Sequence, residues 1–141
     1  MLRVLLADNH AVARDGIRRI LAHDHRVQVV EEASGFLEAI TKAHNTKADV
    51  VILDVHMPLG PGLLAGDLNA QLGSCGAQVL GISFTYDDDA RSLAASIGVT
   101  ELLDKTTLGM DLIPAIMRVA SASNWFPPTV SVKRNRRRVA S

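Results

Sequence analysis

The sequence has few cysteines and few aromatic residues, and it has no long apolar run. It has one cysteine among 141 residues and only 4% aromatic residues. Cys75 therefore has no disulfide partner within the chain, and a thiolate metal cluster is excluded. No stretch approaches the roughly 20 apolar residues of a membrane span, and the apolar run at 1–6 is too short for a signal peptide. We expect a cytoplasmic protein with no membrane partner.

What the sequence does contain is aliphatic residues and balanced charge. Hydrophobic residues make up 48% of the chain, so its length fits one domain with a core of Val, Leu, Ile and Ala. The formal net charge is zero, but five of the fifteen Lys and Arg residues lie in 133–138. Residues 1–132 thus hold ten basic residues against fifteen acidic ones, and the body is acidic while the tail is basic.

Short apolar runs alternate with longer amphipathic stretches. Near-continuous aliphatic runs are typical of parallel strands that helices cover on both faces. Right-handed crossovers then predict an α/β fold, a five-stranded parallel sheet with two helices on one face and three on the other. Strands are expected at 2–7, 27–30, 50–53, 79–83 and 101–103. Helices are expected at about 12–22, 36–45, 63–72, 87–97 and 108–120.

The ends of these segments carry their own signals. The acidic run 87–89 favours a helix start, because acid is stabilised at a helix N-terminus, and Gly98 favours the stop of the same helix. A metal site is the alternative reading of that run. After Ala120, small polar residues and the pair Pro127-Pro128 predict the end of regular structure. We expect one domain over 1–121 and a linker-like, Pro-containing segment with a basic tail over 122–141.

Several polar residues follow strands. Asp54 closes the apolar run 50–53, and Asp8 with Asn9 follows the first strand. Neighbouring parallel strands would gather these oxygens at one edge of the sheet, where they suit Mg²⁺. Ser83 and Lys105 follow the fourth and fifth strands, and the four groups together are what an aspartyl-phosphate site needs, with Asp54 as nucleophile. For Asp54 alone, a turn or helix-cap aspartate is the competing interpretation.

At these residues the chain resembles the receiver domain of two-component response regulators, most closely the subgroup with a LuxR/NarL-type helix-turn-helix behind the receiver. The resemblance covers about residues 2–120, and the motif Asp54-x-x-Met57-Pro58 is its most specific part. The other segments that carry it are 4–10, 12–17, 80–83 and 104–105, together with Gly62.

The resemblance implies the flavodoxin-like strand order 2-1-3-4-5. It also implies that Asp54 accepts phosphate from a sensor histidine kinase and that the backbone carbonyl of His56 joins Asp8, Asn9 and Asp54 as a Mg²⁺ ligand. Such a protein is a phosphoacceptor that assists its own phosphorylation and dephosphorylation rather than an enzyme. The resemblance also implies that such a receiver can form a homodimer, and the oligomeric state stays open. The imidazole of His56, like those of His23 and His25, is expected to be a solvated loop side chain.

Three residues depart from the family pattern. Asn9 replaces a second acid and should weaken metal binding, because charged ligands set affinity in oxygen sites. Leu102 stands where an aromatic switch residue is usual, and Phe84 is bulkier than usual beside Ser83. These departures favour an alternative, a pseudo-receiver that works as an interaction module without phosphorylation.

Two enzyme classes are competing interpretations of the sequence. The segment 60–65 matches the G-x-G-x-x-A form of the dinucleotide fingerprint, but residues 54–59 separate it from the strand and no acid ends the next strand. A haloacid-dehalogenase-type phosphatase would need a second aspartate two residues after Asp54, where His56 stands.

The C-terminal segment bears on output. Residues 125–130 resemble the linker that leads to the DNA-binding half of NarL-type regulators, yet a helix-turn-helix does not fit before Ser141. We expect DNA contact only through a missing output domain or weakly through the basic run 133–138, which has no aromatic residues interleaved for reading bases. A solvated or vestigial tail is the favoured interpretation of this basic run.

Overall fold

The computed structural model describes residues 1–60, 62, 64–99 and 101–125. The basic run 133–138 and the predicted linker from residue 126 onward lie outside the described residues. No helix in the described part of the chain is long and apolar enough to cross a membrane. The chain is already helical at the expected domain limit of residue 121, and this last helix continues to Trp125.

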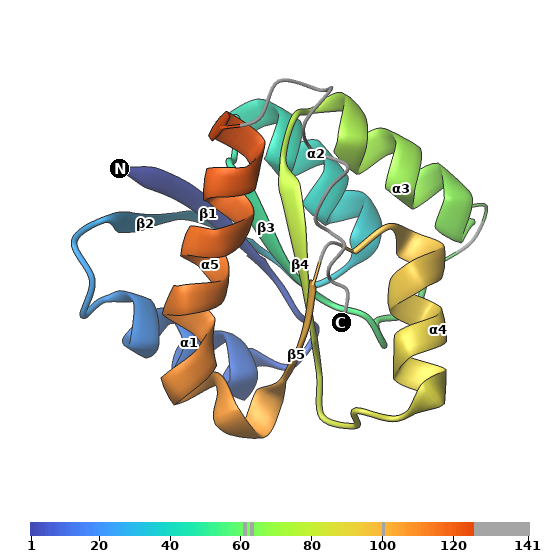
Figure 1. Ribbon diagram of the computed structural model, residues 1–141. Coiled ribbons are helices and arrows are strands. Elements are labelled where there is room, and N and C mark those ends of the chain that lie inside the picture. Colours follow the sequence, from blue (N-terminus) through green and yellow to red (C-terminus); the bar gives the residue numbers. More distant parts are fainter. Residues whose placement is uncertain (61, 63, 100, 126–141) are drawn as a thin grey trace.

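Within the described residues, five strands form one sheet in the order β2-β1-β3-β4-β5, and every neighbouring pair is parallel (Figure 1). Both the parallel α/β sheet and its flavodoxin-like order are thereby confirmed. The strands are β1 (Leu2–Ala7), β2 (Val27–Ala33), β3 (Val50–Asp54), β4 (Gln78–Ser83) and β5 (Glu101–Asp104).

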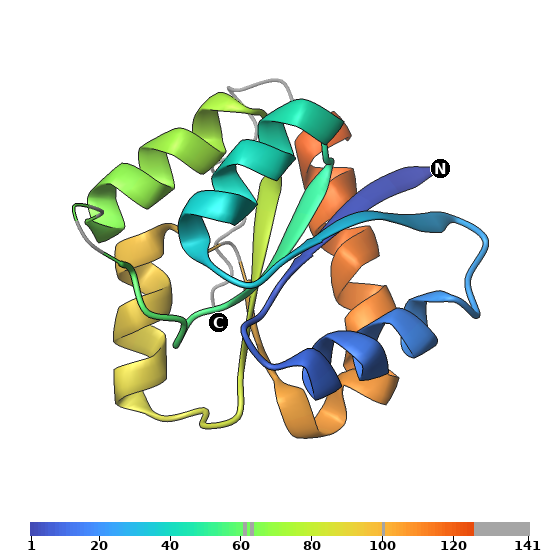
Figure 2. The same ribbon diagram turned by 180° about the vertical axis from the view of Figure 1, so that it is seen from behind.

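Helices cover both faces of this sheet. Figures 1 and 2 show α1 and α5 on one side and α2, α3 and α4 on the other, the predicted two-and-three division. A 3-10 turn, η1, links the last strand to the last helix. The bounds are α1 (Ala11–Leu21), α2 (Phe36–Thr46), α3 (Ala65–Ser74), α4 (Asp88–Ile97), η1 (Lys105–Thr107) and α5 (Leu108–Trp125).

The core explains why the central strands are apolar without alternation. Every residue of β3 is buried, because the sheet is covered on both sides. Odd and even positions of the strand face different layers: Val51 and Leu53 pack under α2, α3 and α4, whereas Val50 and Ile52 pack under α1 and α5. Two apolar clusters therefore pack against the two faces of the sheet and fix the positions of its strands.

The predicted end of the second strand at residue 30 is wrong. β2 continues through Glu31 and Glu32 to Ala33. It is an edge strand, so its charged side chains can remain partly exposed and pair with cations: Lys42 Nζ lies 3.4 Å from Glu31 Oε1, and Arg14 Nε lies 3.1 Å from Glu32 Oε1. Pairing with β1 thus outweighs the low strand propensity of glutamate.

The helix boundary signals were largely correct. Asp87 is the N-cap of α4 and its side chain accepts a hydrogen bond from the Ala90 amide at 3.0 Å, so this residue of the acidic run serves a helix start. Gly98 ends the helix with a φ of 83°. The last helix extends five residues beyond its predicted end at 120, because small polar residues disfavour a helix without blocking it.

Candidate functional site

The polar residues that follow the strands do meet at one edge of the sheet. Asp8 follows β1, Asp54 ends β3, Ser83 ends β4, and Lys105 begins η1 directly after β5. These four strands are successive neighbours in the sheet, so their carboxyl ends lie side by side. The structure therefore brings together the four side chains that were predicted from their places in the sequence.

Asp8, Lys105 and Asp54 form a compact charged group, called here the buried triad. Lys105 Nζ lies 2.7 Å from Asp8 Oδ2 and 3.2 Å from Asp54 Oδ2. The side chains of the triad are only 1–3% exposed. Two carboxylates and one ammonium carry one net negative charge, which is costly to bury without further compensation.

Backbone amides hold the two carboxylates in fixed orientations. The amide of His10 donates to Asp8 Oδ1, and the amide of His56 donates to Asp54 Oδ1, both at 2.9 Å. Each is a local turn in which an aspartate accepts from the residue two positions later. Asp54 Oδ2 consequently faces the Lys105 ammonium, while Oδ1 is held by the chain.

Ser83 is engaged with its own loop. Its hydroxyl donates to the Thr85 carbonyl at 2.6 Å, and His56 Nε2 lies 3.0 Å from Ser83 Oγ and 3.3 Å from Thr85 Oγ1. His56 is exposed, as expected for a loop histidine, and its ring also reaches across to the end of β4. The role of the His56 carbonyl as a metal ligand stays a prediction.

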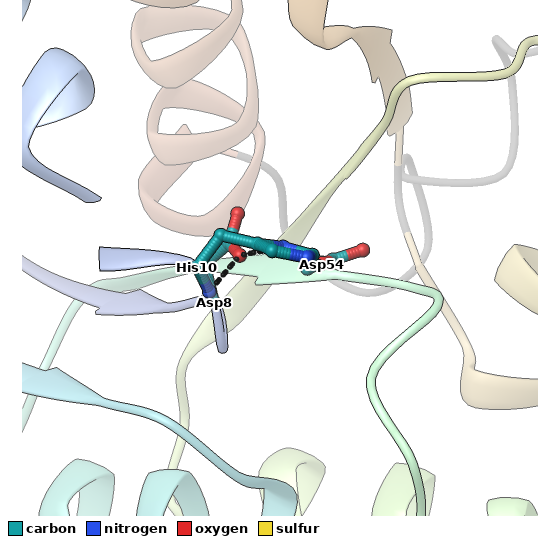
Figure 3. Close-up of side chains that lie close together, drawn as sticks. All are labelled: Asp8, His10 and Asp54. Carbon is teal, nitrogen blue, oxygen red and sulfur yellow. Dashed lines mark hydrogen bonds and ion pairs between the residues drawn. The ribbon is translucent and has the colours of Figure 1, made fainter. Parts of the chain in front are cut away.

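The sequence assigned no role to His10, yet its ring lies within the site. Nδ1 of His10 is 3.2 Å from Asp8 Oδ1 and 3.8 Å from Asp54 Oδ2, and Figure 3 shows the ring extending from Asp8 toward Asp54. Asn9, the predicted ligand between Asp8 and His10, is exposed. The available signal was the position of His10 two residues after a strand-end aspartate, where a turn directs it back over the carboxylate.

The donor set fits a divalent cation. One potential ligand atom from each of Asp8, His10 and Asp54 lies within 4.8 Å of the others. Asp8 Oδ2 is buried and, within the described part of the chain, accepts no hydrogen bond, since the nearby Lys105 ammonium forms an ion pair without hydrogen-bond geometry. A buried oxygen left in this state, in a group of net negative charge, is suited to a metal ion.

Access to Asp54 is through a cavity of about 250 Å³ lined by both site histidines, Phe84, Thr85 and Lys105. Phe84 is 61% exposed, and its ring centre is 4.6 Å from Lys105 Nζ. The ring thus forms a wall of the cavity and stabilises the ammonium by a cation–π contact. Leu102, at the place of the usual switch aromatic, is half-buried against the core under α2, α3 and α4.

Comparison with known proteins identifies the family to which this chain belongs. The family model of the response regulator receiver domain matches residues 4–117. The chain belongs to the response regulator receiver family. Receiver domains bind Mg²⁺ at an acidic pocket, interact with histidine kinases and can dimerise.

One relative is similar to this chain over nearly its whole length. It is 31% identical over 137 residues to the response regulator protein VraR of Staphylococcus aureus, which covers 96% of this chain. The chain spans 65% of the length of that relative.

Solved structures include the signal receiver domain of the response regulator NarL from Mycobacterium tuberculosis, with a TM-score of 0.73 at 27% identity over 85% of this chain and 96% of that one. A LuxR-family two-component regulator from Aurantimonas sp. SI85-9A1 has the same fold, with a TM-score of 0.73 at 22% identity over 97% of each chain. The predicted family resemblance, with NarL and LuxR-family neighbours, is confirmed.

Proposed function

We propose that this receiver accepts a phosphoryl group on Asp54 from the phosphohistidine of a sensor histidine kinase. The phosphorylated receiver would then control an output, and the output we propose is transcription. The observation that carries the proposal is the buried triad, in which Lys105 Nζ lies 3.2 Å from Asp54 Oδ2 at the end of β3. The protein is then a phosphoacceptor of the cytoplasm and not an enzyme that turns over a separate substrate.

Asp54 Oδ2 is the proposed nucleophile. The His56 amide holds Oδ1 at 2.9 Å, so Oδ2 is the oxygen turned toward the cation and the cavity. As the Oδ2–P bond forms, the P–N bond to the kinase histidine breaks, and its electron pair returns to the imidazole nitrogen. Lys105 then neutralises a phosphoryl oxygen, because phosphoryl transfer requires positioning and charge neutralisation more than covalent help.

A bound divalent ion would offset the net negative charge of the buried triad. Asp8, Asn9, Asp54 and the His56 carbonyl are the proposed ligands for Mg²⁺, which when bound would neutralise phosphoryl oxygens during transfer. Asn9 would supply an amide oxygen instead of a carboxylate. Because the Asn9 amide is neutral, Asp8 and Asp54 would be the charged ligands of the site.

Ser83 links the site to the surface. Its hydroxyl is bound to the Thr85 carbonyl at 2.6 Å, so a bond to a new phosphoryl oxygen requires that contact to break and the loop after β4 to move. A phosphoryl group adds about −1.5 to −2 charge, enough to bias a two-state element of this kind. The changed surface would be read by a second receiver in a homodimer or by an output domain.

DNA is a partner only indirectly in this proposal. A separate output domain would bind it, or the basic run 133–138 would contact phosphates weakly and without sequence preference.

A phosphorylation-independent pseudo-receiver is the second candidate. One observation favours it: Lys105 already contacts both carboxylates, so the triad has a built-in cation. In that case the fold would present a constant surface to its partners.

Phosphorylation is tested by incubating the receiver with acetyl phosphate and Mg²⁺ and measuring intact mass. We expect a gain of one phosphoryl group that disappears in Asp54→Ala. The matched control is Asp89→Ala, which removes an exposed carboxylate from α4 and should leave the gain unchanged. No mass gain, or a gain that survives Asp54→Ala, would contradict the proposal and favour the pseudo-receiver.

A further inference from the structure

We propose that the imidazole of His10 is a third side-chain ligand at the Asp8–Asp54 site, which makes this receiver prefer a borderline transition-metal dication, of the Co²⁺, Ni²⁺ and Zn²⁺ class, over Mg²⁺. The inference deepens the proposed function, because it concerns the ion beside Asp54 and rests on that carboxylate being the functional centre. The transition-metal preference itself is a property of the unphosphorylated chain.

The geometry of the three donors supports ligation by the ring. His10 Nδ1 lies 3.2 Å from Asp8 Oδ1 and 3.8 Å from Asp54 Oδ2 (Figure 3). With metal–ligand bonds of about 2.1 Å, two ligands of one ion lie about 3.0 to 3.4 Å apart. The first distance is within that range, and a small movement of the exposed ring would bring the second into it. The ligand atoms of all three residues lie within 4.8 Å of one another, so the carboxylates would also move toward a bound ion.

A second, independent observation is the state of Asp8 Oδ2. Asp8 is 1% exposed, and within the described residues this oxygen accepts no hydrogen bond. The atom is directed into the triad, where it meets Lys105 as an ion pair. Within the described residues its partner is that one ammonium, which also pairs with Asp54, so the two carboxylates keep a net negative charge that a bound cation would offset.

The chemistry of the donors decides which ion fits. Asn9 removes one negative charge relative to a site with a second acid, and Mg²⁺, which sheds its water reluctantly, depends on such charges. A neutral imidazole adds no charge, but it is a good ligand for Co²⁺, Ni²⁺ and Zn²⁺ and a poor one for Mg²⁺. The loss of a charge at Asn9, together with the imidazole of His10 beside the carboxylates, therefore moves the site from magnesium toward transition metals.

The experiment is a calorimetric titration of the untagged receiver with CoCl₂ and with MgCl₂, without phosphodonor, together with the visible absorption of bound Co²⁺. We expect Co²⁺ to bind with at least about hundredfold higher affinity than Mg²⁺. His10→Ala should weaken Co²⁺ binding about tenfold or more and change its visible spectrum, while Mg²⁺ affinity changes less than about twofold.

His10→Ala is a suitable variant because the His10 side chain makes no capping hydrogen bond at the start of α1. His25→Ala removes an exposed histidine elsewhere and should alter neither titration. Asn9→Asp supplies the additional acid and should raise Mg²⁺ affinity, narrowing the gap between the two ions.

Equal weakening of both ions in His10→Ala, or no weakening of either, would overturn the inference. The proposed function fails separately, if acetyl phosphate adds no phosphoryl group with either ion while Co²⁺ binding still depends on His10.

Discussion

Two lysines of this receiver each lie between two carboxylates, one inside the site and one on the surface. Lys105 lies between Asp8 and Asp54, with side-chain exposures of 1–3% throughout the triad. Lys42 Nζ lies 2.9 Å from Glu38 Oε2 and 3.4 Å from Glu31 Oε1, with exposures of 30–43%. The chemical groups are the same, so the contrast isolates the effect of burial.

Water makes the surface cluster tolerant. Hydrogen bonds from the Ser34 amide and from Lys42 lower the pKa of Glu38 to about 2, and the Glu38 carboxylate raises the pKa of Lys42. Such exposed pairs nevertheless add little to stability, because solvent screens them. The buried triad has no such screening, so each of its charges depends on the others, and we expect the site to respond to an added phosphoryl group or ion.

The largest expected effect is from Lys105→Met. It leaves the carboxylates of Asp8 and Asp54 buried without their cation, and we expect a loss of about 3 kcal/mol in the free energy of unfolding at pH 7. Urea denaturation followed by circular dichroism measures it. A shift no larger than that of Lys42→Met would show that burial does not distinguish the clusters.

Asp8→Asn should change stability in the opposite direction. It removes one of two like charges that share a single cation, while the amide oxygen can still accept from the His10 amide. We expect a gain of about 1 kcal/mol, as is common when a functional site is neutralised. The same denaturation series tests it, and a loss of stability would mean that the ion pair outweighs the repulsion.

Lys42→Met should leave the urea midpoint nearly unchanged. The Lys42 ammonium and its partners are partly solvated, so removal of the cation returns the carboxylates to water. In 1 M NaCl, where the screening length is about 3 Å, the remaining difference from the parent should vanish. A large midpoint shift that persists in salt would contradict this.

The smallest effect is a pH dependence at Glu38. Its pKa in the folded chain is about 2, below the ordinary 4.5, so the carboxylate adds stability above pH 4.5 that is lost as the pH falls toward 2. The difference in unfolding free energy between the parent and Glu38→Gln should be constant from pH 7 to 5 and shrink at pH 3. Denaturation at these values measures it; a difference that grows at pH 3 has the wrong sign.

Much of the fold was predictable because parallel strands that helices cover on both faces appear in the sequence as nearly continuous apolar runs. The continuous aliphatic run before Asp54 identified β3, and Asp87 with Gly98 bounded α4 closely. The predicted end of β2 was wrong for a clear reason. Glutamate is uncommon in strands, and the sequence does not show that Lys42 and Arg14 pair with Glu31 and Glu32.

The site was predictable to the extent that it depends on strand ends. Asp8, Asp54, Ser83 and Lys105 could be assembled from the chain alone, because parallel neighbours align their carboxyl ends at one edge. His10 and the ring of His56 could not, since the conformation of the loops after β1 and β3 determines where each ring points.

The amino-acid sequence alone therefore determined the family, the α/β architecture and the identity of the phosphoacceptor candidate, because each follows from local patterns repeated along the chain. The folded molecule determined which oxygen of Asp54 faces a cation, that Lys105 contacts both carboxylates, and that the His10 ring lies beside Asp8 and Asp54. These are distances between residues far apart in sequence or directions set by a turn, and only packing of the strands and loops determines them.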